Sequence, residues 1–288
     1  MAETRRVGPS VGEKRCTFRR LHDTGCFVLP NPWDVGTARY LQHLRFPALA
    51  TTSAGAAFAM GLPDTAWAVP RDVMLAHIRT IVEATDLPVN ADFESGYADE
   101  PEGVAANVRR CVATGVAGLS IEDATGNAAR PLYELPLAAE RILAARTAAD
   151  EAGADVVLTA RAECFLVGRR DLDEVIRRLT DYAKAGADCL YAPGIKTREE
   201  IAAVVDAVAP KPVNVLIGGA SDLTVADLAG LGVRRVSLGS ALARAAWGGF
   251  IRAAERIASA GRFDGLSGAV PVADLNTFFG DDLRRRSS

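Results

Sequence analysis

Three short apolar segments of this sequence end in residues that can do acid–base or metal chemistry. Asn90 and Asp92 end the first segment, Glu122 ends the second and Arg161 ends the third. Because side chains alternate along a strand, Asn90 and Asp92 share one face. If the segments are neighbouring parallel strands, Asp92, Glu122 and Arg161 converge on a common pocket.

The chemistry that these side chains favour is cleavage of a bond next to a carbonyl group. Asp92, Asn90 and Glu122 offer the oxygen ligands that Mg2+ prefers, with Mn2+ as the alternative ion, and a 2-oxo acid would supply further ligands. A metal ion at the keto oxygen would stabilise an enolate, and Arg161 would hold a carboxylate through two hydrogen bonds. Arg161 and Glu122 are therefore candidate catalytic residues. The alternative for Asp92 and Glu122 is a salt-bridged rim that only supports the fold.

Eight apolar runs, alternating with segments of helical period, are expected to position these residues. The predicted strands are 27–29, 48–52, 88–92, 118–122, 156–161, 189–192, 213–217 and 235–238. Eight consecutive units favour an α/β fold of the (β/α)8 TIM barrel type over an open doubly wound sheet, because no glycine-rich fingerprint follows the first strand. Trp33, just after that strand, is a candidate to cap the pocket, and Asn214 on the seventh strand is a candidate substrate ligand.

The segments between strands carry apolar stripes of helical spacing, which are expected to face the barrel. Thr197, with Glu200 three residues later, predicts a capping box at the start of one helix. The apolar stripes are Val73, Ile78, Ile81 and Val82 before the third strand, Val104, Val108 and Val112 before the fourth, and Val175, Leu179 and Tyr182 after the fifth.

The chain is predicted to comprise a flexible N-terminal tail over residues 1–20 and a single barrel domain over residues 21–288. The domain includes a C-terminal helical extension in which Phe263, Phe278 and Phe279 present more apolar surface than a free tail should expose. Docking on a second subunit would cover this surface. A homo-oligomer, either a dimer or a tetramer, is therefore expected.

Composition excludes several classes of protein. A formal net charge of -3 gives no indication of nucleic acid or of an anionic membrane as a partner, and no run approaches the roughly 20 apolar residues of a membrane span. The five cysteines are scattered, which favours a reducing cytoplasm over a disulfide framework. A small carboxylate substrate is the expected partner.

Histidine and cysteine chemistry is not expected in the pocket. His22, His43 and His77 are predicted to lie away from every strand end, so neither a histidine triad nor a zinc site is favoured. Cys164 follows Arg161 closely, but a cysteine without a histidine partner is usually a small packed hydrophobe.

Several motifs, in this order and spacing, resemble the isocitrate lyase and phosphoenolpyruvate mutase superfamily over roughly residues 25 to 250. The resemblance is to its 2-methylisocitrate lyase and oxaloacetate decarboxylase-like branch. The motifs are Thr51-Thr52-Ser53-Ala54-Gly55, Gly61-Leu62-Pro63-Asp64, Asn90-Ala91-Asp92 with Gly96-Tyr97, Ile121-Glu122-Asp123 and Ala160-Arg161.

This resemblance implies a barrel that binds Mg2+ and a 2-oxo acid or its enolate, in tetramers that exchange C-terminal helices. Ser53 and the amides of Ala54 and Gly55 would bind the substrate carboxylate and keto oxygen. Asp64, also a candidate catalytic residue, would surround the metal ion together with Asp92 and Glu122, and Arg161 would contact the substrate.

The sequence departs from the superfamily pattern at two places. Members that cleave isocitrate or methylisocitrate carry a cysteine motif after the fourth strand, where this chain has Thr125-Gly126-Asn127-Ala128-Ala129-Arg130, and the loop of the phosphonopyruvate enzymes is also missing. Asn90 stands where relatives carry the acid that ligates the metal most directly. The loss of one negative charge should lower the affinity for Mg2+.

Without the cysteine, the least demanding activity is release of CO2 or another carbonyl fragment from a 2-oxo acid, because water can protonate the enolate. A carbon–carbon lyase using Tyr133 or Glu134 as acid or base is a second form of the same hypothesis. Three alternatives remain open: a phosphonopyruvate or phosphoenolpyruvate mutase-like enzyme of P–C bonds, a barrel isomerase that binds phosphate near Gly219 and Ser240, and a catalytically degenerate protein that only binds a 2-oxo acid.

Overall fold

The computed structural model describes residues 8–287, which fall into two compact units. The larger unit spans residues 10–241, and the described residues from 242 onward belong to the other. This division differs from the single domain predicted for residues 21–288. The boundary falls at the start of the helix that follows the last strand.

The larger unit is a (β/α)8 barrel, as predicted. Its strands pair in the order β1-β8-β7-β6-β5-β4-β3-β2, and every pair is parallel. Across the remaining seam, the amide of Ala50 donates to the carbonyl of Pro30 at 3.0 Å. The strands are β1 (Phe27–Leu29), β2 (Leu49–Ala50), β3 (Val89–Asp92), β4 (Gly118–Glu122), β5 (Val157–Arg161), β6 (Cys189–Tyr191), β7 (Val213–Leu216) and β8 (Arg235–Ser237).

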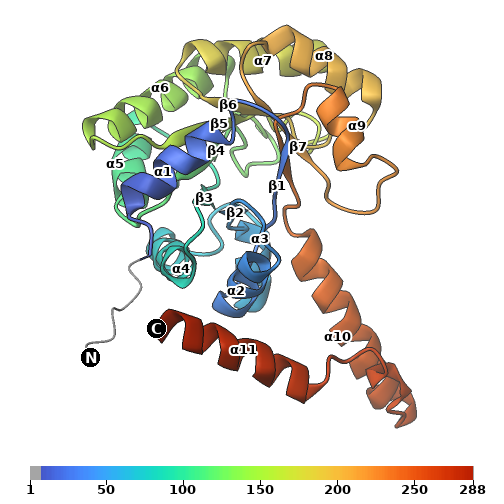
Figure 1. Ribbon diagram of the computed structural model, residues 1–288. Helices are drawn as coiled ribbons and strands as arrows, with labels where there is room; N and C mark the ends of the chain where they lie inside the picture. The colour runs from blue at the N-terminus through green and yellow to red at the C-terminus, as the bar shows by residue number, and fades with distance from the viewer. Residues whose placement is uncertain (1–7, 288) are drawn as a thin grey trace, which may run out of the picture. The chain divides into compact units, whose positions relative to one another are not determined.

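A helix follows each strand, and an additional short helix, α3, follows β2. Figure 1 shows α5, α6, α7 and α8 on the outside of the sheet. The helices are α1 (Val11–Arg20), α2 (Val35–His43), α3 (Ser53–Ala59), α4 (Arg71–Ala84), α5 (Pro101–Val112), α6 (Leu135–Glu151), α7 (Leu172–Lys184), α8 (Arg198–Val208), α9 (Val225–Gly230), α10 (Ala241–Ala260) and α11 (Val272–Ser287), with a 3-10 turn at Asp264–Leu266.

The apolar stripes of the sequence bury the barrel-facing sides of these helices, with one exception. On α4, Ile78, Ile81 and Val82 are buried as predicted, but Val73 is exposed and Met74 takes its place in the core. The stripes of α5 and α7 are buried throughout. The capping box of Thr197 and Glu200 at the start of α8 is confirmed.

The prediction of a flexible tail over residues 1–20 is wrong for residues 11–20, and residues 1–7 lie outside the described part of the chain. Ser10 and Glu13 form a capping box that starts α1, and Phe18 on this helix is fully buried. The polar and basic residues of the segment concealed its one deeply buried aromatic side chain.

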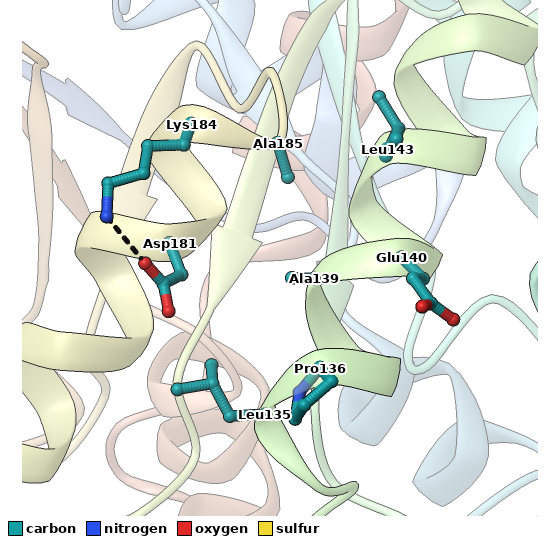
Figure 2. Close-up of a pocket in the computed structure, with 8 residues that line it drawn as sticks. All are labelled: Leu135, Pro136, Ala139, Glu140, Leu143, Asp181, Lys184 and Ala185. Carbon is teal, nitrogen blue, oxygen red and sulfur yellow. Dashed lines mark hydrogen bonds and ion pairs between the residues drawn. The ribbon is translucent and has the colours of Figure 1, made fainter.

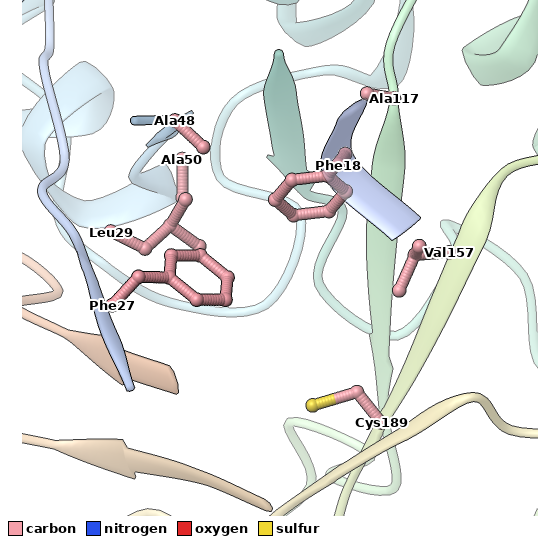
Figure 3. Close-up of a cluster of buried hydrophobic side chains, with 8 residues drawn as sticks. All are labelled: Phe18, Phe27, Leu29, Ala48, Ala50, Ala117, Val157 and Cys189. Atoms are coloured by element: carbon pink, nitrogen blue, oxygen red, sulfur yellow. The ribbon is translucent and has the colours of Figure 1, made fainter. Parts of the chain in front are cut away.

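Phe18 packs into the core at the end of the barrel where the strands begin (Figure 3). A Cβ atom on Gly118, the first residue of β4, would lie 2.5 Å from the Phe18 ring and 2.6 Å from the amide oxygen of Asn90. Only glycine therefore fits between the floor of the barrel and the residues above it. The other members of this cluster are Phe27, Leu29, Ala48, Ala50, Ala117, Val157 and Cys189.

His22 joins this floor to a charged residue inside the barrel. One ring nitrogen, Nδ1, lies 2.8 Å from the carbonyl oxygen of Phe18, and Nε2 lies 3.3 Å from Nη1 of Arg235. A neutral ring that donates from Nδ1 and accepts at Nε2 satisfies both contacts. Burial first, and then the positive charge of Arg235, lower the pKa of His22 to about 3.

The described residues beyond 241 form helices with large apolar side chains on their surface. Phe250, Phe263 and Val272 are 62%, 68% and 74% exposed. In the part of the chain described here, no helix combines the length and the apolar character needed to cross a membrane.

We predict that Phe18→Ala lowers the free energy of unfolding by about 3–5 kcal/mol, because it leaves a cavity in the barrel floor. Chemical denaturation measures this change. Arg20→Ala, an exposed position on the same helix, is the control and should change stability by less than about 0.5 kcal/mol. Equal stability of both variants would mean that α1 does not pack on the barrel.

We predict that His22 makes stability fall as the pH drops from about 6.5 towards 3. In that window the unfolded chain binds a proton that the folded protein excludes, with Arg235, Arg19 and Asp188 setting the charge around the ring. His22→Gln should therefore reduce the slope of unfolding free energy against pH by up to about 1.4 kcal/mol per pH unit. His43→Gln, at an exposed position, is the control. An unchanged slope in His22→Gln would contradict the assignment.

Candidate active site

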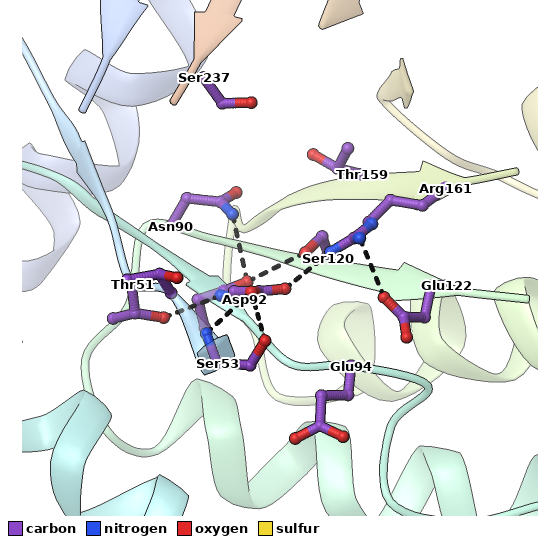
Figure 4. Close-up of polar contacts among 12 residues, drawn as sticks. Thr51, Ser53, Asn90, Asp92, Glu94, Ser120, Glu122, Thr159, Arg161 and Ser237 are labelled. Carbon is purple, nitrogen blue, oxygen red and sulfur yellow. Dashed lines mark hydrogen bonds and ion pairs between the residues drawn. The ribbon is translucent and has the colours of Figure 1, made fainter. Parts of the chain in front are cut away.

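A cavity of about 180 Å³ opens among the carboxyl ends of the strands, and all eight strands contribute to its wall. This volume suits a small metabolite rather than a drug-sized ligand, which occupies roughly 300–1,000 Å³. Its polar contacts are drawn in Figure 4. One wall residue from each strand, in chain order, is Leu29, Ala50, Asp92, Ser120, Arg161, Tyr191, Asn214 and Ser237.

A second hollow, outside the barrel, lies between α6 and α7 (Figure 2). Its lining is largely aliphatic, including Leu135, Pro136 and Leu143, and its charged residues include an ion pair between Lys184 and Asp181. It brings together no set of groups that could act on a substrate. The barrel cavity is therefore the candidate active site.

Asp92 lies at the centre of the polar contacts in the cavity (Figure 4). One carboxylate oxygen accepts hydrogen bonds from the amide and the hydroxyl of Ser53, at 3.0 and 2.9 Å. The other oxygen accepts from Arg161 at 2.8 Å, while the Asp92 amide donates to the Thr51 hydroxyl. Asp92 thus fixes the start of α3 against the ends of β3 and β5.

Arg161 binds three carboxylates, one through each of its nitrogens. The distances are 2.8 Å from Nη1 to Asp92, 3.1 Å from Nη2 to Glu122 and 2.8 Å from Nε to Glu163. Burial alone would lower the pKa of Arg161, but the attraction of these three carboxylates raises it well above its usual value. Arg161 thus brings Asp92 and Glu122 together, although only Asp92 and Arg161 of the three predicted pocket residues line the cavity.

The same contacts change what Arg161 can do. Each nitrogen of Arg161 already binds a protein carboxylate, so a substrate carboxylate bound at Nη1 and Nη2 would meet the negative charges of Asp92 and Glu122. Removing Arg161 would also leave three carboxylates without their common partner, which costs about 3–5 kcal/mol for a buried pair. Arg161→Ala should therefore lose stability as well as activity.

Negative charge accumulates around Asp92. Burial and the nearby Asp92 raise the pKa of Asp64, and burial raises that of Glu94. Burial, with Glu163, Asp92 and Glu94 nearby, raises the pKa of Glu122 well above its usual range despite Arg161. These carboxyl groups outnumber the single guanidinium among them, and a cation in the cavity would relieve their repulsion.

The donor set fits a hard divalent cation. The side-chain oxygen of Asn90 is buried and has no hydrogen-bond partner, although an amide oxygen is a suitable ligand. Among residues 8–287, no three His, Cys, Asp or Glu side chains are arranged around a common metal position. The residues therefore suit an ion that keeps several waters and takes further oxygens from a substrate, as Mg2+ does.

Only some of the remaining predicted substrate ligands line the cavity. Ser53 lines the cavity, but the amide of Gly55 donates to the side chain of Thr52 at 3.1 Å, so it is not free for a substrate oxygen. Ala54 and Gly55 are buried in the first turn of α3 and are not among the cavity-lining residues. Trp33 is half-buried and also lies outside the lining. Asn214 is fully buried and lines the cavity, as predicted.

Asp64 reaches the cavity from a loop that is tied to the end of β3. The carboxylate of Glu94 accepts hydrogen bonds from the amide of Trp67 at 2.9 Å and from the hydroxyl of Tyr97 at 2.6 Å. Trp67, Glu94 and Tyr97 all have left-handed backbones, with φ of 58°, 46° and 55°. Such strain in non-glycine residues gathers where structure holds a functional group in place.

A second set of buried charges supports these strand ends from outside the barrel. Asp123, next to Glu122, accepts hydrogen bonds from Tyr182 at 2.6 Å and from Arg178 at 3.1 Å on α7, and from the amide of Glu163 at 2.8 Å. The structure thus gives Asp123 a supporting role. Its neighbour Glu122 turns inward to the site.

The acids and nucleophiles considered in the sequence do not reach the cavity. The hydroxyl of Tyr133 donates to Asp99, and Glu134 is exposed at the start of α6. Burial raises the pKa of Cys164 to about 12, so its thiol stays protonated and is a poor nucleophile. Gly219 is exposed and is not part of the cavity wall, whereas Ser240 is.

Sequence reasoning missed several wall residues, among them Arg235, Tyr191 and Ser237. Arg235 begins β8, and the pair Arg234-Arg235 does not by itself indicate which guanidinium points into the barrel. The period-two pattern does indicate it, because Arg235 and Ser237 alternate with Val236.

Sequence and structure both relate the chain to known proteins. The family described as phosphoenolpyruvate phosphomutase matches residues 18–258. An oxaloacetate decarboxylase of Bradyrhizobium diazoefficiens is 31% identical over 226 residues, 74% of this chain and 74% of that protein. A crystal structure from Burkholderia cenocepacia J2315 is 50% identical with a TM-score of 0.89, over 93% of this chain and 96% of that one.

A phosphonopyruvate hydrolase, crystallised in complex with oxalate and Mg2+, is 26% identical with a TM-score of 0.82, over 94% of this chain and 96% of that one. Members of the family thus include lyases, decarboxylases, hydrolases and mutases of small acids, and this chain is an enzyme. The resemblance seen in the sequence is confirmed: the chain belongs to the phosphoenolpyruvate mutase and isocitrate lyase superfamily.

Proposed function

We propose that this enzyme is a Mg2+-dependent carbon–carbon lyase or decarboxylase that acts on a small 2-oxo or hydroxy polycarboxylate through an enolate. The observation that carries the proposal is the crowding of Asp64, Asp92, Glu94 and Glu122, which with burial raises the pKa of Asp64, Glu94 and Glu122. Mn2+ is an alternative ion for the same oxygen ligands.

Asp92 and Asn90 are the residues that would hold the ion most directly, with Glu122 and Asp64 binding its waters. When bound, Mg2+ supplies positive charge opposite the negative charge that develops on the substrate's keto oxygen. Ser53 would orient the substrate at this end of the cavity, and Arg161 holds the carboxylates of Asp92 and Glu122 close together.

Decarboxylation is the activity that the cavity favours among those of the superfamily. Loss of CO2 needs no acid for the leaving group, and water can protonate the enolate afterwards. The described cavity wall contains neither cysteine nor histidine, and Tyr133 is occupied by Asp99. A reaction that demands a positioned proton donor has no obvious candidate here.

Oxaloacetate is the substrate that we expect to be turned over. We predict Mg2+-dependent release of pyruvate from oxaloacetate, and little or no turnover of 2-methylisocitrate and phosphonopyruvate. A steady-state assay of the three substrates, with and without EDTA, checks this. Turnover of phosphonopyruvate alone would favour the P–C bond alternative, and binding of oxalate without any turnover would favour the degenerate binding protein.

Asp92→Asn keeps the size of the side chain and removes one charge from the proposed ion site. We predict that it weakens Mg2+ binding about 10- to 100-fold, measured by the Mg2+ dependence of turnover and by calorimetry, and that it folds. Asp86→Asn, an exposed position just before β3, is the control and should match the wild type. Wild-type Mg2+ affinity in Asp92→Asn would remove Asp92 from the ion site.

We also propose that the chain is a cytoplasmic homo-oligomer, a dimer or a tetramer, that buries the exposed side chains of α10 and α11. Light scattering after gel filtration should give a multiple of the 30.4 kDa chain mass, and Phe250→Asp should lower it. A monomeric wild type would contradict this proposal and leave the apolar surface without a purpose.

A further inference from the structure

Arg235 is a second guanidinium in the wall of the active-site cavity, and its surroundings differ from those of Arg161. It is 2% exposed, and its hydrogen-bond partners are neutral: Nε donates to Asn214 at 2.9 Å, and Nη2 donates to Thr159 at 3.0 Å. Its third partner is the ring of His22. No carboxylate among residues 8–287 forms an ion pair with Arg235.

Asp188, an acidic residue near His22, is already bound to other residues. Asp188 binds Arg19 and Arg146, each at 3.0 Å, and accepts a hydrogen bond from the amide of Leu158. Arg235 therefore carries a buried positive charge without a counter-ion among residues 8–287. Burying such a charge costs several kcal/mol unless something compensates it.

The cavity is thus electrically divided. Its acidic side is formed by Asp64 and Asp92, which line the cavity next to Arg161, and Glu122 and Glu163 are bound to the same guanidinium. Its basic side comes from β8, which lies opposite β4 in the strand order. Since Arg235 begins β8 and Ser237 ends it, Arg235 lies deeper in the barrel than Ser237.

We infer that Arg235, with Asn214 and Ser237, forms a second anion subsite that binds the far carboxylate of a dicarboxylate substrate. Asn214 and Ser237 are hydrogen-bonded at 2.9 Å and both line the cavity beside Arg235. Three of the five N–H donors of Arg235 account for its contacts with the described residues, and the remaining two could bind a planar carboxylate. The inference rests on the proposed function, because the other end of the substrate must meet the acidic side.

This subsite explains how a cavity rich in carboxylates can hold a dianion. The first carboxylate and the keto oxygen would approach the cation near Asp92, while the second carboxylate would neutralise Arg235. A monocarboxylate such as pyruvate can bind at only one end of the cavity. The product should therefore dissociate more readily than the substrate.

The test compares two ligands that differ only in the far carboxylate. Calorimetry in Mg2+ buffer measures binding of L-malate, L-lactate and oxalate to the wild type, Arg235→Gln and Arg235→Lys. We expect the wild type to bind malate about 10- to 100-fold more tightly than lactate. Arg235→Gln should bring the two within about threefold, Arg235→Lys should restore part of the difference, and oxalate binding should be unchanged.

Two further variants separate recognition from support. Thr159→Val removes a hydrogen bond to Arg235 from a residue outside the cavity wall, and it should lower stability without changing the malate to lactate ratio. Ser237→Ala keeps Arg235 and should reduce the ratio severalfold, which tests the subsite even if Arg235→Gln fails to fold. 3-Phosphonolactate tests the ligand class, and tighter binding of it than of malate would overturn the assignment to a carboxylate.

The outcomes distinguish this inference from the proposed function. If the wild type binds oxalate with Mg2+ but binds malate no better than lactate, the subsite is wrong and the proposed function stands. If Arg235→Gln weakens malate, lactate and oxalate equally, Arg235 only supports the barrel. If the wild type binds none of the three ligands, both the proposed function and the subsite are wrong.

Discussion

The guanidinium of Arg161, bound to carboxylates from three adjacent strand ends, is the interaction on which the site depends. It holds Asp92, Glu122 and Glu163 within about 3 Å and so fixes the ends of β3, β4 and β5 relative to one another. Charges of this kind are expensive to bury, and their geometry must be supplied by the fold. The barrel floor, the strained Glu94 loop and the Asp123 network each hold one part of that geometry.

Arg161 has more protein partners than its position suggests. A lone arginine at a strand end is expected to bind substrate, whereas here each of its nitrogens also binds a protein carboxylate. The free positive charge lies instead at Arg235, whose partners are neutral. The two proposals together give the cavity a cation-binding side and an anion-binding side, which matches a substrate with an oxygen-rich head and a second carboxylate.

Much of this arrangement was predictable from the sequence, because apolar runs and period-two alternation are local properties. The predicted strands agree with β1 and β4 at both ends, and the inward direction of Asp92 and Glu122 follows from the side-chain period. The three ion pairs of Arg161 were not predictable, because they depend on which strands become neighbours and on how far the side chains reach.

Other features were missed because one residue carried the signal. Phe18 converts a basic, polar segment into a packed helix, and a single aromatic residue is weak evidence in a sequence. Arg235 was overlooked because it lies at the start of its strand, while barrel chemistry is sought at the ends. His22 was dismissed for the same reason, although it lies directly beneath Arg235.

The central claim is that the acidic side of the cavity binds a divalent cation together with the oxygens of a small acid. A crystal structure of the enzyme with Mg2+ and oxalate, an enolate mimic, tests this most directly. The account predicts Mg2+ beside Asn90 and Asp92, with oxalate on the ion near Ser53. Oxalate bound at Arg235 with no ion near Asp92, or an Arg161 cluster that leaves no room for either, would contradict it.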